Sequence, residues 1–244
     1  MVTFNNAGRM GNWLFEGFSA AAYALKHNLD FTVPSQSDNP KWNPIYCFHL
    51  IDKNYNHDLE QVRLWENGHH WQELPFEESW RDKNIIIEGY RQSEQYFKDY
   101  RNELLYLFDF PYEKKEGYVA VHIRRGDYLN LTDKHPPVTK EWYENVMSMF
   151  SNFRFYFVSD DIDWCRQEFG SRSDCEFSTG LSEVQDLIDG SCCEHTISSS
   201  STFGWWVAWL NRNPNKIVYI PKLWFVENYH LETRDIVPSG WYKL

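Results

Sequence analysis

The sequence predicts an α/β protein whose C-terminal part is a doubly wound parallel sheet. Two observations carry this prediction. Apolar strand-like runs alternate with helix-like runs beyond residue 118, and the chain opens with a strand, a glycine turn and a helix, as Rossmann-type domains do. The 244 residues are 42% hydrophobic and 24% charged, an ordinary globular mix with room for one large domain or two compact ones.

The N-terminal half contains three predicted strands, at residues 2–5, 29–33 and 84–89. It also contains two predicted helices, at residues 12–27 and 93–108. Gly8 and Gly11 mark the turn before the first helix. Residues 34–80 show no reliable period, so no element is predicted there.

A linker is predicted at residues 109–117, which are rich in Pro, Gly and charge, so we expect two domains, 1–112 and 113–244. Five strands are predicted beyond it, at residues 118–123, 154–159, 175–178, 195–198 and 216–220. Four helices are predicted between them, at residues 139–150, 162–169, 182–191 and 203–210.

The net charge of −11 argues against a nucleic acid or an anionic membrane as a partner, because both attract basic surfaces. The sequence shows no signal peptide and no apolar run long enough to cross a membrane. Its five cysteines form no CxxC pair. These features predict a cytoplasmic protein.

The sharpest motif is HIRRGDY, residues 122–128, at the end of an apolar strand. Alternation along the strand places His122 and Arg124 on one face, so both leave its carboxyl end, where open α/β sheets bind ligands. A guanidinium in that place suits a diphosphate. The alternative is that Arg124 and Arg125 are a surface pair bound to nearby carboxylates.

Two further features suit a phosphorylated ligand. Ser201 and Thr202 precede an apolar helix, whose free N–H groups attract phosphate, although plain capping is at least as common. Asp186, on the preceding helix, is able to accept a hydrogen bond from a base or ribose, or else caps its helix. The glycines of the loop at residues 8–12 would allow a ligand to approach the backbone closely, or serve the turn alone.

Together these segments resemble the α-1,2-fucosyltransferases of glycosyltransferase family 11, and more distantly the α-1,6 and protein O-fucosyltransferases. The matching motifs are GRMGNWLF (8–15), EGYRQSEQYF (88–97), VHIRRGDY (121–128), VSDD (158–161) and DLIDGSCCEHTISSSSTFGWWVAWLN (186–211). The chain departs from the family pattern at Trp13, Glu16, Ser200 and Gly204; the last stands where the family usually has Ser.

The resemblance implies a GT-B-like pair of Rossmann-type domains facing a cleft, with the acceptor on the N-terminal domain and GDP-L-fucose on the C-terminal one. It implies transfer with inversion and no cofactor or essential metal. By matched position, Arg124 stabilises the departing phosphate, Ser201 or Thr202 holds phosphate oxygens, and His122 and Asp186 contact guanosine. The acceptor implied is an oligosaccharide with a terminal galactose.

The remaining donor-side residues implied are Gly8, Arg9, Gly11, Asn12 and Arg125. Arg125 is expected mainly to orient its loop through an ion pair. Asp127 is the nearest motif carboxylate for a general base, unless it pairs with Arg125. Glu16, expected opposite it in the N-terminal loop, is the second candidate for this base.

Two other functions remain open. Asp161 and Asp163 follow an apolar strand as the DxD of a metal-dependent GT-A glycosyltransferase would. Alternatively, the 12 Trp, 15 Tyr and 17 Phe would serve a non-catalytic carbohydrate-binding protein. Among these aromatics, Trp205, Trp206 and Trp209 are predicted to be core residues because of their helical spacing.

Overall fold

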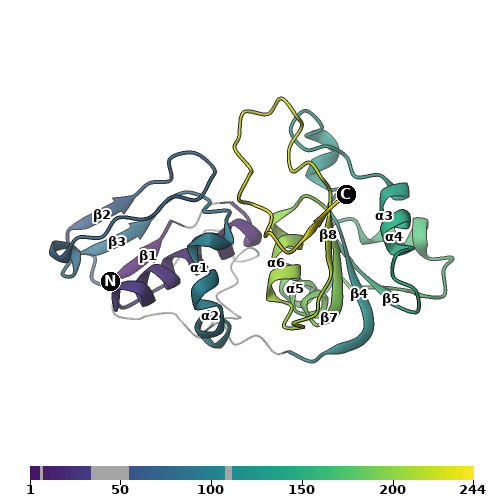
Figure 1. Ribbon diagram of the computed structural model, residues 1–244, viewed down its shortest axis with the longest axis horizontal. Helices are drawn as coiled ribbons and strands as arrows, with labels where there is room; N and C mark the ends of the chain where they lie inside the picture. The colour runs from purple at the N-terminus through teal and green to yellow at the C-terminus, as the bar shows by residue number, and fades with distance from the viewer. Residues whose placement is uncertain (6–7, 34–54, 108–111) are drawn as a thin grey trace. The chain divides into compact units, whose positions relative to one another are not determined.

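The computed structural model describes residues 1–5, 8–33, 55–107 and 112–244. They form two α/β units, each with its own sheet (Figure 1). Unit 1 comprises Met1–Phe110 and Leu231–Pro238, and unit 2 comprises Pro111–His230 and Ser239–Leu244. The C-terminal half therefore returns once to unit 1, a crossing that the sequence does not predict. The acceptor and donor roles expected of the two domains stay predictions.

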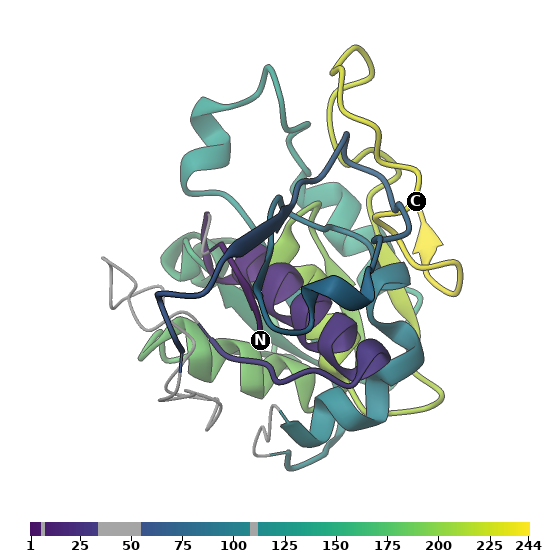
Figure 2. The ribbon, with the colours of Figure 1, turned by 90° about the vertical axis from the view of Figure 1, so that its left-hand side faces the viewer.

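Unit 1 contains a three-stranded parallel sheet in the order β1-β3-β2. Its strands are β1 (Val2–Phe4), β2 (Gln61–Leu64) and β3 (Asn84–Ile87). Helix α1 (Met10–His27), purple in Figure 2, follows β1 and buries most of its residues. The turn before it passes through Gly8, whose φ of +80° favours glycine. The first strand, the first helix and the strand predicted at residues 84–89 are confirmed.

The strand predicted at residues 29–33 is wrong. Asn28 ends α1 in the left-handed conformation, and the following chain joins β1 by one bridge, between Val2 and Phe31. Strand β2 and the 3-10 turn η3 (Glu78–Trp80) lie where no element is predicted. Residues 34–54 of that stretch lie outside the described residues.

The helix predicted at residues 93–108 is only partly formed. The chain makes two 3-10 turns, η4 (Glu94–Tyr96) and η5 (Lys98–Tyr100), before α2 (Arg101–Leu107). Phe97 interrupts it with φ −144° and ψ −7°, and its buried ring lies 6.1 Å from Phe15 and 5.8 Å from Phe18. Burial of this ring against α1 explains why the helix starts late. Residue 108 lies outside the described residues.

Unit 2 contains a six-stranded parallel sheet in the order β6-β5-β4-β7-β8-β9. Its strands are β4 (Lys115–Ile123), β5 (Arg154–Ser159), β6 (Cys175–Phe177), β7 (Cys193–Ser198), β8 (Val218–Ile220) and β9 (Tyr242–Lys243). The five predicted strands are confirmed, whereas β9 is not predicted. This order is that of a Rossmann sheet. Because β4 starts at Lys115, the predicted linker is shorter than expected.

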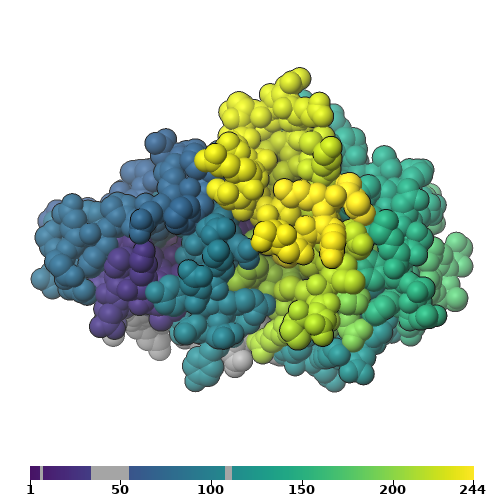
Figure 3. All heavy atoms as spheres, viewed as in Figure 1, coloured from purple at the N-terminus to yellow at the C-terminus, as the bar shows by residue number. Residues whose placement is uncertain are grey.

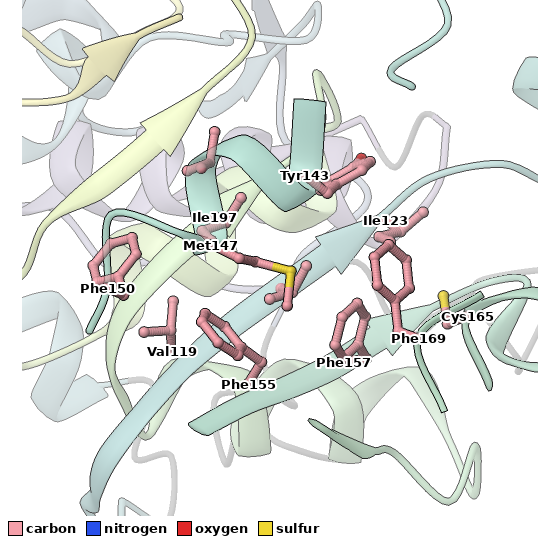
Figure 4. Close-up of a cluster of buried hydrophobic side chains, with 12 residues drawn as sticks. Val119, Ile123, Tyr143, Met147, Phe150, Phe155, Phe157, Cys165, Phe169 and Ile197 are labelled. Atoms are coloured by element: carbon pink, nitrogen blue, oxygen red, sulfur yellow. The ribbon is translucent and has the colours of Figure 1, made fainter. Parts of the chain in front are cut away.

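Helices cover both faces of the second sheet, so the doubly wound class is confirmed. They are α3 (Lys140–Met147), α4 (Ile162–Phe169), α5 (Glu183–Ser191) and α6 (Thr202–Leu210). One face of the sheet packs its core against α3 and α4 (Figure 4). The other packs against α5 and α6, where a Cβ on Gly190 would meet Val207 and Val158. Trp205, Trp206 and Trp209 are at most 3% exposed, which confirms them as core residues.

The strand order reverses between β4 and β7. The chain moves from β4 towards β5 on one side and from β7 towards β8 on the other. The loops after these two strands therefore diverge, and open α/β sheets bind ligands in the crevice that this leaves. No helix among the described residues has the length and apolarity to span a membrane.

Candidate functional site

The loops after β4 and β7 bring the central motifs of unit 2 together. His122 lies in register with Ser198, and the Ser199 N–H donates to the His122 carbonyl at 3.0 Å. Val119, Val121 and Ile123 fill the core on the α3 and α4 face. His122 and Arg124 therefore belong to the opposite face, as the alternation of the strand predicts.

Arg124 lies between two carboxylates. Its Nη2 is 2.6 Å from Asp127 Oδ1, and its Nη1 is 2.8 Å from Asp160 Oδ2. The Arg124 side chain is 14% exposed, and its guanidinium lies 5.4 Å from the centre of the Tyr128 ring. A phosphate that approaches Arg124 would thus compete with carboxylates already in place.

Arg125 has a different set of partners. Its Nε donates to Asp161 at 3.0 Å, its guanidinium lies 3.9 Å from the centre of the Trp164 ring, and its backbone N–H donates to Asp160 at 2.9 Å. These contacts fit the expected role in orienting the loop. Asp127 pairs with Arg124, whereas Arg125 pairs with Asp161.

The two acids of the DxD motif both have structural partners. Asp161 caps α4 by accepting from the Trp164 N–H at 3.3 Å, in addition to its contact with Arg125. Asp163 pairs with Arg166 at 2.9 Å. In the ranges that the structure describes, no group of three or more potential metal-ligating side chains occurs.

His122 is buried beneath the first turn of α6. Its Nδ1 lies 3.0 Å from Ser199 Oγ, and its ring stacks on Phe203 at 5.3 Å. Burial, with a smaller effect of Arg124, lowers the His122 pKa to about 3, so the ring is neutral at physiological pH. A Cβ on Gly204 would lie 2.1 Å from Ser198 Oγ and 2.4 Å from His122 Nδ1, so a larger residue would require these side chains to shift.

Two of the serine hydroxyl groups that precede α6 donate hydrogen bonds to backbone carbonyls. Ser198 Oγ donates to the Ser199 carbonyl at 2.8 Å, and Ser200 Oγ donates to the Leu223 carbonyl at 2.7 Å. Ser201 is the N-cap residue, yet its side chain makes no capping hydrogen bond. Together with Thr202, it leaves the first turn of α6 as a place for an anion at the crevice.

Asp186 lies in the first turn of α5 and is half-buried. Ser182 is the N-cap of this helix, so the interpretation of Asp186 as an ordinary capping acid is wrong. Burial raises the pKa of Asp186, and a hydrogen bond with Ser178 opposes this effect. The carboxylate therefore lies beside the residue that follows β6, at the carboxyl edge of the same sheet.

Gly8, Arg9, Gly11 and Asn12 belong to unit 1, whereas the other predicted site residues belong to unit 2. Gly8 and Arg9 are exposed, and Gly11 is buried in the first turn of α1. Asn12 accepts a hydrogen bond from Gln92 at 2.9 Å, which joins two of the motifs recognised in the sequence.

Glu16 does not lie in a loop. It is part of α1 and is 0% exposed. The expectation that it lies in the N-terminal loop as a second candidate base is wrong, because it belongs to the buried face of α1 in the interior of unit 1.

Three residues beside Arg124 were not singled out from the sequence: Asp160, Tyr128 and His135. Asp160 contacts both arginines of the motif, and Tyr128 stacks on His135 at 3.8 Å. Burial lowers the pKa of His135, although Asp127 opposes this effect. Tyr128 belongs to the HIRRGDY motif and Asp160 to the VSDD motif, so the sequence carried a signal for both. His135 lies in an aperiodic loop that carries none.

Comparisons with known proteins give the following relatives. Residues 1–244 match the model of glycosyl transferase family 11. The chain is 32% identical over 178 residues to an Escherichia coli alpha-1,2-colitosyltransferase, covering 64% of this chain and 61% of that protein. It is 28% identical over 243 residues to the Rattus norvegicus galactoside alpha-(1,2)-fucosyltransferase 2, covering 86% of this chain and 67% of the rat protein.

A solved structure shares the fold. POFUT1, crystallised in complex with GDP-fucose, superposes with a TM-score of 0.50 at 13% identity, covering 90% of this chain and 97% of that chain. This likeness supports the GT-B-like α/β class. The chain spans about three-fifths of the length of the E. coli relative.

Proposed function

Because this chain belongs to glycosyltransferase family 11, we propose that it transfers L-fucose from GDP-β-L-fucose to O2 of a terminal β-galactoside, with inversion. The name of the rat relative supports the acceptor and the linkage. Colitose is the second candidate for the transferred sugar, because the E. coli relative is named for it. The proposal needs no cofactor or metal.

The position of Arg124 is the observation that carries the proposal. The residue follows β4 at the switch point of a Rossmann sheet and belongs to the same face as the start of α6. A guanidinium and the first turn of a helix are the two groups that best stabilise a diphosphate. The neutral ring of His122 adds no charge of its own to this place.

In the proposed reaction, the acceptor hydroxyl attacks the anomeric carbon opposite the phosphate. The bond from that carbon to the phosphate oxygen breaks, and GDP leaves with the electron pair. Arg124 stabilises the negative charge that grows on the departing β-phosphate, while Ser201 or Thr202 holds its oxygens. Asp127 accepts the hydroxyl proton, once the phosphate has replaced it at Arg124.

The test combines the purified chain with GDP-fucose or the matching colitose donor, a panel of galactosides, and either EDTA or Mn²⁺. Product linkage is mapped by NMR. We expect an α-1,2-fucosylated galactoside, formed equally well with EDTA. If only colitose is transferred, colitose replaces fucose as the proposed donor sugar. A strict requirement for Mn²⁺ would favour the DxD alternative instead.

GDP binding separates the enzyme from a carbohydrate-binding protein. We expect calorimetry to show GDP binding that is lost in Arg124→Ala and kept in Arg154→Ala. Arg154 is a matched control because it is half-exposed and pairs with Glu176, away from the motif. Sugar binding without affinity for GDP would overturn the assignment as a transferase.

A further inference from the structure

Unit 1 contains a pocket of about 200 Å³ that none of the predicted site residues lines. One wall is the second half of α1, which contributes Tyr23 and Lys26. The other walls are the segments 71–74 and 95–100, which follow β2 and β3 in the chain. The blue and teal segments of unit 1 in Figure 3 form part of the surface in that view.

The lining has the chemistry that a sugar ring requires. Trp71, which is 41% exposed, and the partly exposed Tyr100 offer aromatic surface. Glu73, Gln95 and Asp99 surround it with hydrogen-bonding groups, and all three are exposed. Aromatic rings suit the C–H face of a pyranose, while carboxylate and amide groups suit its hydroxyls.

Hydrogen bonds hold the aromatic walls in place. The Tyr96 hydroxyl accepts from the Gln72 N–H at 3.1 Å, and the Tyr23 hydroxyl donates to the Pro75 carbonyl at 2.7 Å. The backbone N–H of Trp71 donates to the Asp235 carboxylate at 2.9 Å. A pocket whose walls are already fixed loses little conformational entropy when it binds a ligand.

Size and charge narrow the ligand. Drug-sized ligands occupy pockets of about 300–1,000 Å³, so a pocket of about 200 Å³ suits one ring rather than an oligosaccharide or a nucleotide. Lys26 pairs with Glu73 at 3.3 Å, which leaves Asp99 to make the lining acidic. An acidic lining repels phosphates and other anions.

We propose that this pocket binds one neutral pyranose residue of the acceptor glycan, at a position other than the galactose that receives the fucose. The proposal rests on the proposed function in taking the glycan to be the acceptor. It assigns to unit 1 a second sugar site, separate from the donor site, that favours longer acceptors over short ones.

Direct binding tests the pocket without turnover. Saturation-transfer NMR is run with methyl hexopyranosides on the intact chain, on Trp71→Ala, on Gln95→Ala and on Trp65→Ala. Trp65 is the matched control, because it is 68% exposed in the same unit and does not line the pocket. We expect about a tenfold higher Kd in Trp71→Ala and a smaller rise in Gln95→Ala. An unchanged Kd in both pocket variants would overturn the proposal.

Turnover with acceptors of increasing length is the second readout. In Trp71→Ala, we expect KM to rise for trisaccharide and longer acceptors, while kcat and the values for a methyl galactoside stay as in the intact chain. An equal effect on short and long acceptors would refute a remote sugar site. If no galactoside is fucosylated, the proposed function fails, and the binding experiment still decides whether the pocket takes a sugar.

Discussion

At Gly204, helix propensity and steric packing predict opposite effects of a substitution by alanine. Alanine favours a helix over glycine by up to about 1 kcal/mol, so propensity alone predicts a more stable α6. The added Cβ, however, would lie 2.1 Å from Ser198 Oγ and 2.4 Å from His122 Nδ1, far inside any real contact. Both neighbours are at most 3% exposed, so neither relieves the contact by moving out into solvent. Overpacking of this kind costs about 1–3 kcal/mol.

The midpoint of this cost, about 2 kcal/mol, less the helix-propensity gain of about 1 kcal/mol leaves a net loss of about 1 kcal/mol, which lowers Tm by about 2–4 °C in a chain of this size. Differential scanning fluorimetry measures it, and calorimetry measures the accompanying loss of GDP affinity as His122 and the start of α6 are displaced. Gly240→Ala is the control, because a Cβ there meets nothing within 4 Å. Adding Ser198→Ala removes one of the two contacts and should restore part of the stability. A Gly204→Ala protein at least as stable as Gly240→Ala would refute the reasoning.

Three further outcomes follow from the contacts of the motif loop. Arg124→Ala should reduce the rate of transfer by about 10²–10³-fold in a steady-state assay, as the loss of a preorganised charge does, and a rate within tenfold of the intact chain would contradict its role. Arg125→Ala should lower the free energy of unfolding by about 1 kcal/mol, because it loses the contacts with Asp161 and the Trp164 ring. It should reduce GDP affinity less than Arg124→Ala does, and a larger reduction in Arg125→Ala would contradict the assignment. The pKa of His122 is about 3 in the folded chain and about 6.5 in the unfolded chain, so only the unfolded chain binds a proton between these values. Stability therefore falls as pH drops below about 6.5, and at pH 5 the free energy of unfolding is lower by about 2 kcal/mol. Tm should depend less on pH in His122→Asn.

The sequence predicts much of unit 2 because its signals are local and strong. Residues 119–123 at the end of β4 and residues 204–210 of α6 are largely apolar runs, and every residue of both runs is buried. The register that joins His122 to Ser198 follows once their strands are neighbours at the switch point. By contrast, β9 has two exposed residues and no pattern to detect.

The missed features depend on contacts between distant residues. Asp160 belongs to the VSDD motif, but its hydrogen bond from the Arg125 N–H spans 35 positions of the chain, which no local spacing reveals. Phe97 looks like one more apolar residue of a helix, yet its burial against α1 interrupts that helix. Glu16 lies within the helix predicted at residues 12–27, but the sequence does not reveal that a charged residue there is fully buried.

The return of Leu231–Pro238 to unit 1 has a consequence for engineering. Dissecting the protein at one peptide bond near residue 110 would leave the C-terminal fragment with a stretch whose Ile236, 0% exposed in the intact chain, has lost its surroundings. A chimaera that exchanges unit 1 of this chain would therefore have to include this short excursion together with the N-terminal half, because a single crossover near residue 110 separates the two.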